Sequence, residues 1–305
     1  PWAGMARFAR SGGEANAIAI RIARAFNGRE KIAICGYHGW HDWYLATNLN
    51  GTEGLEDHLL PGLEPNGVPK GLKGTTLPFM YNKIEQLKRI FEEHEISAVK
   101  MEVQRSEPPV PGYLEEVRSL CNKHGAVLIF DECTSGFRET FGGLHLKYGV
   151  NPDLAMYGKA MGNGYAITAV IGTTEVMQAV QSTFISSTFW TERIGPAAAL
   201  ATLEEMERFE SYKQVTKMGT YLKKIWKEIF EKYKLEVNIG GLEALATFNF
   251  TKLDHLKAKT YITQEMLKKG WLASDKCYVS MAHTKKVINN YSHDFEKTIS
   301  NLAKI

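Results

Sequence analysis

Long apolar runs and long runs of like charge are both missing from this sequence of 305 residues. No apolar stretch approaches the roughly 20 residues that a membrane-spanning helix needs. The 37 basic and 34 acidic residues are distributed along the whole chain and leave a net charge of +3. We therefore expect a protein that neither spans a membrane nor binds nucleic acid.

Cysteine is also scarce. The chain has only four, at Cys35, Cys121, Cys133 and Cys277. They show no CxxC or Cys/His ligand spacing, so we predict neither a disulfide framework nor a structural zinc site. A reducing cytoplasm fits this cysteine usage best. His38 and His41 could bind a metal ion, but no third ligand stands at a helical or hairpin spacing from them, and we expect no metal.

What the sequence does contain is an alternation of helix and strand patterns. Apolar residues at helical spacing alternate with short apolar runs that are typical of buried strands. We predict helices over residues 14–26, 84–93 and 114–124 and strands over residues 31–35, 98–101, 126–130, 154–157 and 166–171. This alternation predicts an α/β core with a mainly parallel sheet.

The character of the chain changes near Thr202, where a long helical stretch rich in Lys and Glu begins. A chain of this length is expected to form a large core and a smaller appended domain. We predict a large α/β domain over residues 1–205 and a smaller C-terminal α+β domain over residues 206–305. Residues 50–78 are rich in Gly and Pro and predict a long irregular loop.

Polar side chains follow several of the predicted strands. In open parallel sheets, ligands bind outside the carboxyl ends of the strands. Glu102 and Asp131 stand at two such ends, and Lys159 follows the strand over 154–157. A lone lysine is usually a solvated surface group, but glycines leave space around this one. We expect the preceding apolar segment to carry Lys159 toward the interior, where loss of water makes its amine nucleophilic.

Residues Ser11, Gly12 and Gly13 directly precede the first predicted helix. Free N–H groups at such a helix N-terminus can bind an anion such as a phosphate. The alternative is an ordinary N-cap with a flexible turn. A Rossmann nucleotide-binding module is disfavoured because the G-x-G-x-x-G spacing is missing. The aromatic segment over 37–43 is either a core cluster or the lining of a site.

Several motifs occur together in a recognisable order and spacing. They are Ser11-Gly12-Gly13-Glu14-Ala15-Asn16, Tyr37-His38-Gly39-Trp40-His41, Phe130-Asp131-Glu132, Gly136-Phe137-Arg138 and Tyr157-Gly158-Lys159. In this arrangement the chain resembles the class III aminotransferases, and most of all glutamate-1-semialdehyde aminomutase and its aminotransferase relatives. The resemblance implies a fold-type I transferase with a mainly parallel, seven-stranded sheet flanked by helices, and pyridoxal 5′-phosphate as cofactor.

The resemblance also implies roles for single residues. Asp131 faces the pyridine nitrogen of the cofactor and keeps it protonated, while Lys159 forms a Schiff base and acts as general acid and base; these two are the predicted catalytic residues. Tyr37 stacks on the ring. Thr188 reaches the phosphate of the neighbouring subunit, which implies a homodimer with shared active sites. The predicted cofactor-binding residues are Ser11, Gly12, Gly13, Tyr37, His38, Glu102, Asp131, Cys133, Lys159 and Thr188.

The predicted function is transfer of an amino group on a small amino-acid or oxo-acid substrate, dependent on pyridoxal phosphate. Aminotransferase and aminomutase share this machinery, and the sequence does not separate them. Family members carry a further segment before the part that matches Arg7, including some of the substrate entrance. The alternative is therefore a non-catalytic or weakly active remnant that binds the cofactor but lacks the N-terminal substrate-binding segment.

Overall fold

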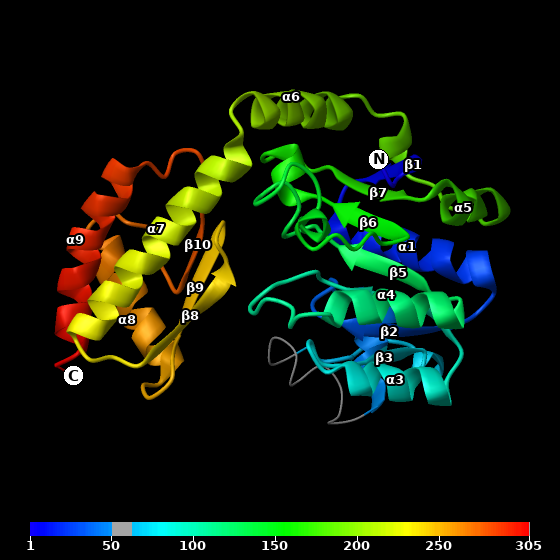
Figure 1. The fold of residues 1–305 in the computed structure, drawn as a ribbon, viewed down its shortest axis with the longest axis horizontal. Helices are drawn as coiled ribbons and strands as arrows, with labels where there is room; N and C mark the ends of the chain where they lie inside the picture. Colours follow the sequence, from blue (N-terminus) through cyan, green and yellow to red (C-terminus); the bar gives the residue numbers. More distant parts are fainter. Residues whose placement is uncertain (51–62, 305) are drawn as a thin grey trace. The chain divides into compact units, whose positions relative to one another are not determined.

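The computed structural model describes residues 1–50 and 63–304, so residues 51–62 of the predicted loop lie outside the described residues. The chain divides into two compact units (Figure 1). The large unit comprises Pro1–Val103, Pro109–Phe137 and Gly142–Glu204. The small unit comprises Gln104–Pro108, Arg138–Phe141 and Glu205–Ile305. The assignment of separate functional domains to residues 1–205 and 206–305 stays a prediction.

The large unit is built on a seven-stranded sheet in the order β1-β7-β6-β5-β4-β2-β3. Its strands are β1 Met5–Ala9, β2 Lys31–Cys35, β3 Thr76–Pro78, β4 Ile96–Met101, β5 Val127–Asp131, β6 Leu154–Tyr157 and β7 Thr168–Gly172. Neighbouring strands from β3 to β6 are parallel, whereas β7 runs antiparallel to both β6 and β1. The predicted fold class, with its mainly parallel seven-stranded sheet, is confirmed.

Helix α1, Gly12–Asn27, packs on one face of this sheet. Ser11 is its N-cap, with an extended backbone and a side chain that accepts a hydrogen bond from the Glu14 N–H. Gly28 ends the helix in the left-handed conformation, with φ 70°. The buried stripe of α1 is rich in alanine and isoleucine, which lets the helix approach the sheet closely. This packing fixes the N-terminus of α1 at the carboxyl edge of the strands.

Helices α3, Ile84–Glu93, and α4, Tyr113–His124, cover the opposite face of the sheet. Figure 1 shows α3 and α4 in front of the strands and α1 behind them. The helices that begin in this unit, besides α1, are α2 Asp42–Leu45, α3 Ile84–Glu93, α4 Tyr113–His124, α5 Thr174–Met177 and α6 Ile194–Arg208. Gly125 ends α4 with φ 62°. Among the described residues, no helix is long and apolar enough to cross a membrane.

The small unit combines an antiparallel sheet with three helices. The sheet has the order β10-β9-β8, and the elements are α7 Ser211–Lys232, β8 Val237–Leu242, β9 Leu245–Phe250, α8 His255–Leu267, β10 Lys276–Tyr278 and α9 Lys285–Leu302. Its core is aromatic: Trp226 and Phe230 of α7 pack against Phe248 and Phe295. The unit therefore has a core of its own.

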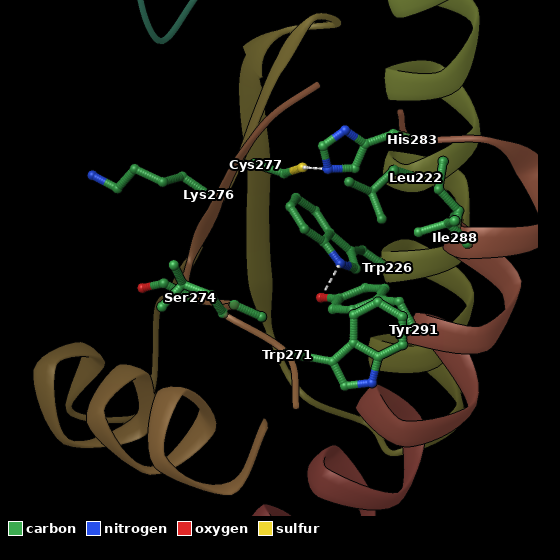
Figure 2. Close-up of a pocket in the computed structure, with 12 residues that line it drawn as sticks. Leu222, Trp226, Trp271, Ser274, Lys276, Cys277, His283, Ile288 and Tyr291 are labelled. Atoms are coloured by element: carbon green, nitrogen blue, oxygen red, sulfur yellow. Dashed lines mark hydrogen bonds between the residues drawn. The ribbon is translucent and has the colours of Figure 1, made fainter. Parts of the chain in front are cut away.

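A small cavity of about 110 Å³ lies inside the small unit, beside α7, α9 and β10 (Figure 2). Trp226 donates a hydrogen bond of 3.0 Å to the hydroxyl of Tyr291 at its wall. The Cys277 sulfur lies 3.7 Å from Nε2 of His283. Burial raises the pKa of this thiol to about 11, so Cys277 is an uncharged, weakly reactive group.

Candidate active site

A pocket of about 430 Å³ opens at the carboxyl edge of the large sheet, where open α/β sheets bind their ligands. Its lining comes from the start of α1, the segment after β5 and the segment between β6 and β7. The lining residues are Arg10, Gly12, Cys133, Gly158, Lys159, Gly164, Tyr165, Ala166, Ile167 and Thr168. The predicted residues Gly12, Cys133 and Lys159 therefore meet in one pocket.

Lys159 lies two residues after the end of β6. Its Nζ atom donates a hydrogen bond of 2.7 Å to the hydroxyl of Thr134. Its backbone has φ 45°, in the left-handed region that residues other than glycine rarely adopt. Such strained positions cluster at functional sites. The turn before it requires Gly158, because a Cβ there would lie 2.9 Å from a methyl group of Thr168.

The expected burial of Lys159 is wrong, since its side chain is exposed. The apolar segment before it, β6, is buried, but the chain leaves the sheet at Gly158 and turns into a short 3-10 helix, Lys159–Gly162. This turn directs the amine into the open pocket and away from the core. The Lys159 amine is therefore accessible to a ligand in the pocket.

Asp131 ends β5 and is almost fully buried, at 5% exposure. Its Oδ1 atom accepts a hydrogen bond of 3.2 Å from the Cys133 N–H, and its Oδ2 atom lies 2.9 Å from Nδ1 of His38. Lys100 Nζ lies 3.5 Å from the same Oδ2 atom. Burial opposes ionisation of this carboxyl group, but the Lys100 charge and His38 outweigh burial and hold its pKa below the ordinary value.

His38 connects this carboxylate to the end of β2. Its Nδ1 atom faces Asp131, and its Nε2 atom lies 3.0 Å from the backbone oxygen of Cys35. Asn16 of α1 donates a hydrogen bond of 2.9 Å to the His38 carbonyl, which holds the loop against the helix. Burial lowers the pKa of His38, and the Lys100 charge adds to that effect.

The start of α1 lies beside these groups. Thr168 donates a hydrogen bond of 3.2 Å to the carbonyl of Ser11. A Cβ on Gly13 would lie 2.3 Å from Cε1 of His41, so only glycine fits there without moving the imidazole ring. Nδ1 of His41 is buried and has no hydrogen-bond partner within the part of the chain that the structure describes. The N-terminus of α1 thus presents backbone N–H groups beside an unsatisfied imidazole nitrogen.

Of the remaining predicted site residues, Cys133 lines the pocket, whereas Tyr37, Glu102 and Thr188 are not among its lining residues. The Tyr37 N–H donates to Oε2 of Glu102 at 3.4 Å, which joins the ends of β2 and β4. Burial raises the pKa of Cys133 well above its ordinary value, and the Asp131 carboxylate adds to that effect, so the thiol is uncharged. Thr188 begins an exposed 3-10 turn, Thr188–Trp190, and does not line the pocket in the described part of this chain.

The residues of this region that were not predicted as site residues from the sequence include Lys100, Thr134, Tyr165 and Thr168. The sequence does indicate that Lys100 is unusual, because it is a charged residue inside the apolar run of β4. Thr134 and Thr168 are ordinary hydroxyl residues near strand ends. They become recognisable only through their contacts with Lys159 and Ser11.

The sequence profile described as class-III aminotransferase matches residues 3–295. The chain belongs to this family. The predicted family is thereby confirmed. The 3-aminobutyryl-CoA aminotransferase of Cloacimonas acidaminovorans is 36% identical over 264 residues, which cover 83% of this chain and 59% of that protein. The glutamate-1-semialdehyde 2,1-aminomutase of Methanothrix thermoacetophila is 36% identical over 252 residues, which cover 79% of this chain and 57% of that protein.

This class III aminotransferase chain thus spans less than two thirds of the length of these two relatives. Solved structures agree on the fold. An omega-transaminase from Sphaerobacter thermophilus superposes with a TM-score of 0.86 at 22% identity, covering 100% of this chain and 76% of that one. The FumI protein of Sphingopyxis sp. MTA144, solved in a form with pyridoxal phosphate, gives 0.87 at 22% identity, with coverages of 99% and 72%.

Proposed function

We propose that this chain carries the catalytic core of an enzyme that transfers an amino group with pyridoxal 5′-phosphate, as an aminotransferase or an aminomutase. Family membership supports the cofactor and the class of reaction. The observation that carries the proposal is the meeting of an exposed lysine amine, Lys159, with the N-terminus of α1 in one pocket. Asp131 adjoins that pocket through the backbone N–H of Cys133.

The groups around the pocket match what the cofactor needs. The first N–H groups of α1, on Gly12 and Gly13, have no acceptor within the helix, and together with the helix dipole they suit a phosphate. Asp131 stays ionised and can accept a hydrogen bond from a protonated ring nitrogen. Nδ1 of His41, which has no hydrogen-bond partner among the described residues, offers one more polar contact. We assign Tyr37, His38, Glu102 and the uncharged Cys133 to contacts with the ring or its partners.

The bound cofactor supplies an electron-withdrawing ring that stabilises negative charge on the substrate. The side chains provide the rest. Asp131 holds the proton on the ring nitrogen. The Lys159 amine carries the cofactor and moves a proton as general base and acid. Thr134, which accepts a hydrogen bond from Lys159 Nζ at 2.7 Å, orients that amine.

We further propose a small amino-acid or oxo-acid substrate, since the family acts on such compounds. A homodimer is proposed because the family resemblance implies that Thr188 binds the phosphate of a neighbouring subunit, and Thr188 is exposed here and is not among the lining residues of the pocket. A cytoplasmic location is proposed because the four cysteines are free. The proposed alternative is a non-catalytic or weakly active remnant that binds the cofactor but lacks the N-terminal substrate-binding segment.

The test begins with purified protein and pyridoxal phosphate. We expect a yellow complex whose colour is lost on borohydride treatment, with the mass of the reduced cofactor fixed on a peptide that contains Lys159. Lys159→Ala should abolish this adduct, while the matched exposed lysine variant Lys147→Ala should retain it. A Lys159→Ala protein that still forms the adduct contradicts the proposal. A panel of amino donors and oxo acceptors then separates the enzyme from the remnant.

A further inference from the structure

Lys100 is a charged residue in the most buried part of the sheet. It lies in β4, all of whose residues are buried, and its own side chain has 0% exposure. In the sheet register it pairs with Ile34 on β2 and Ile129 on β5. Burying a lysine without a partner is strongly unfavourable, so its contacts explain why it is tolerated.

The amine of Lys100 contacts residues of the candidate active site and of the sheet core, and it is not exposed to solvent. Nζ of Lys100 lies 3.5 Å from Oδ2 of Asp131 and donates a hydrogen bond of 3.4 Å to the sulfur of Met156. Side chains alternate along a strand, so Lys100 and Ile129 share a sheet face with Asp131 two residues further on. The Lys100 side chain therefore reaches Asp131 along the same face of the sheet, from the interior of the strands toward their carboxyl ends.

Few other ionisable groups face Lys100. Glu102 at the end of β4 and Cys133 after β5 act on it in addition to Asp131, and the Lys100 charge acts in turn on His38 after β2. Helix α1, which covers this face, presents buried alanine and isoleucine side chains and the neutral Asn16. Burial lowers the pKa of Lys100, and the Asp131 carboxylate opposes that effect.

Two basic groups thus compete for one buried carboxylate. His38 lies 2.9 Å and Lys100 3.5 Å from the same oxygen of Asp131. A single carboxylate balances the charge of only one cation in a buried setting. A protonated ring nitrogen, which the proposed function brings to Asp131, is a third competitor for this negative charge.

We propose that Lys100 is a positioning residue that competes with the ring nitrogen of the cofactor for Asp131 and so limits how strongly the site favours a protonated ring. This inference rests on the proposed function. It concerns how strongly Asp131 stabilises a protonated ring nitrogen, whereas the adduct at Lys159 should form with or without Lys100.

The test compares two ligands of the apoprotein: pyridoxal phosphate and its deaza analogue, in which carbon replaces the ring nitrogen. Lys100→Met keeps an unbranched side chain and removes the charge. We expect the preference for pyridoxal phosphate over the analogue to increase by about tenfold, as for a shift of one pKa unit. In 15N NMR spectra of the bound cofactor, labelled at the ring nitrogen, the pH midpoint of that nitrogen's signal should rise by about one unit for the same reason.

Lys100→Gln is the second charge-removing variant, and it keeps a polar group near Asp131. It should behave like Lys100→Met. Met156→Leu is the matched control, because it alters packing around Lys100 without removing charge, and it should leave both quantities at their wild-type values. Either Lys100 variant with a wild-type preference and a wild-type midpoint overturns the inference.

Two further measurements separate this inference from the proposed function. Asp131→Asn should remove the preference for pyridoxal phosphate over the analogue, whatever residue stands at position 100. A wild-type protein that forms no adduct at Lys159 contradicts the proposed function. The Lys100 inference alone is contradicted by a different combination of results. In that case the wild-type protein forms the adduct and its preference for pyridoxal phosphate over the analogue depends on Asp131, but the Lys100 variants leave this preference unchanged.

Discussion

His38 and Asp131 are joined by a buried contact of 2.9 Å between Nδ1 and Oδ2, although His38 follows β2 and Asp131 ends β5. The other imidazole nitrogen faces the backbone oxygen of Cys35 at 3.0 Å. Both flanking atoms are acceptors, so the ring satisfies both only when it carries two protons. Burial and Lys100 oppose that form by lowering the pKa of His38. The proton held by His38 is therefore coupled to the charge on Lys100.

Replacement of His38 should be costly even without cofactor. In His38→Gln we expect the free energy of unfolding of the apoprotein to fall by about 1–3 kcal/mol, because glutamine carries its donors on one nitrogen and cannot face both Asp131 and the Cys35 carbonyl as the two ring nitrogens do. Urea denaturation followed by circular dichroism measures this loss. His41→Gln is the matched control, since Nδ1 of His41 has no partner to lose among the described residues. An equal loss in both variants would show that the contact with Asp131 does not stabilise the protein.

The stability of the apoprotein should depend on pH through Lys100. Its pKa is lowered in the folded protein, so between that value and the unfolded value of about 10.4 the unfolded chain binds more protons. Wild-type stability therefore rises with pH through this window. Lys100→Met lacks this contribution.

The stability of Lys100→Met relative to wild type should thus be highest at low pH and should fall as the pH rises toward about 10. Urea denaturation at a series of pH values gives this difference directly. Met156→Leu should differ from wild type by a constant amount across the series. If the difference in stability between Lys100→Met and wild type were also constant across the pH series, Lys100 would have the same pKa in the folded and unfolded states.

The N-cap of α1 should contribute to stability and to cofactor binding together. In Ser11→Ala we expect a loss of about 1 kcal/mol in the free energy of unfolding, the usual cost of losing a capping hydroxyl. Thr284 caps α9 in the small unit with the same hydrogen-bond pattern, because its side chain accepts a hydrogen bond from the Val287 N–H. Thr284→Ala should lose a similar amount without weakening binding of pyridoxal phosphate, whereas Ser11→Ala should weaken it. Isothermal titration of both apoproteins tests the difference.

Local patterns were sufficient to predict much of the fold. The helix predicted over 84–93 coincides with α3, and Gly125 ends α4 as its sequence position indicates. The strand ends that carry Asp131 and Lys159 were also predicted. These features depend on neighbours close in sequence: apolar periodicity, a glycine after a helix, and polar residues after an apolar run.

Other features depend on contacts between distant segments, and sequence periodicity does not encode them. The short strands β1 and β3 were not predicted, since β1 is only partly buried and β3 has three residues. The exposure of Lys159 follows from a left-handed backbone turn, and the partnership of Lys100 with Asp131 follows from the register of β4 with β5. The sequence shows that Lys100 lies in an apolar strand, but it does not show that Asp131 is its partner.

Gly13 gives the last prediction, because the space above its Cα atom is occupied by the His41 ring. A methyl group there would lie 2.3 Å from Cε1, closer than van der Waals contact allows, so the ring must move. The obstacle is a side chain and not backbone, which leaves the fold intact. In Gly13→Ala we therefore expect a melting temperature of the apoprotein close to that of wild type.

The displaced ring and the added methyl group should instead obstruct the anion site at the start of α1. We expect affinity for pyridoxal phosphate to fall by about tenfold or more, equivalent to about 1.4 kcal/mol. Gly71→Ala is the matched control, since a Cβ at Gly71 meets no atom within 4 Å among the described residues. Isothermal titration with pyridoxal phosphate gives both affinities. If Gly13→Ala bound as tightly as Gly71→Ala, the phosphate could not lie at this end of α1, because the N–H groups proposed to bind it are the ones that the new methyl group crowds.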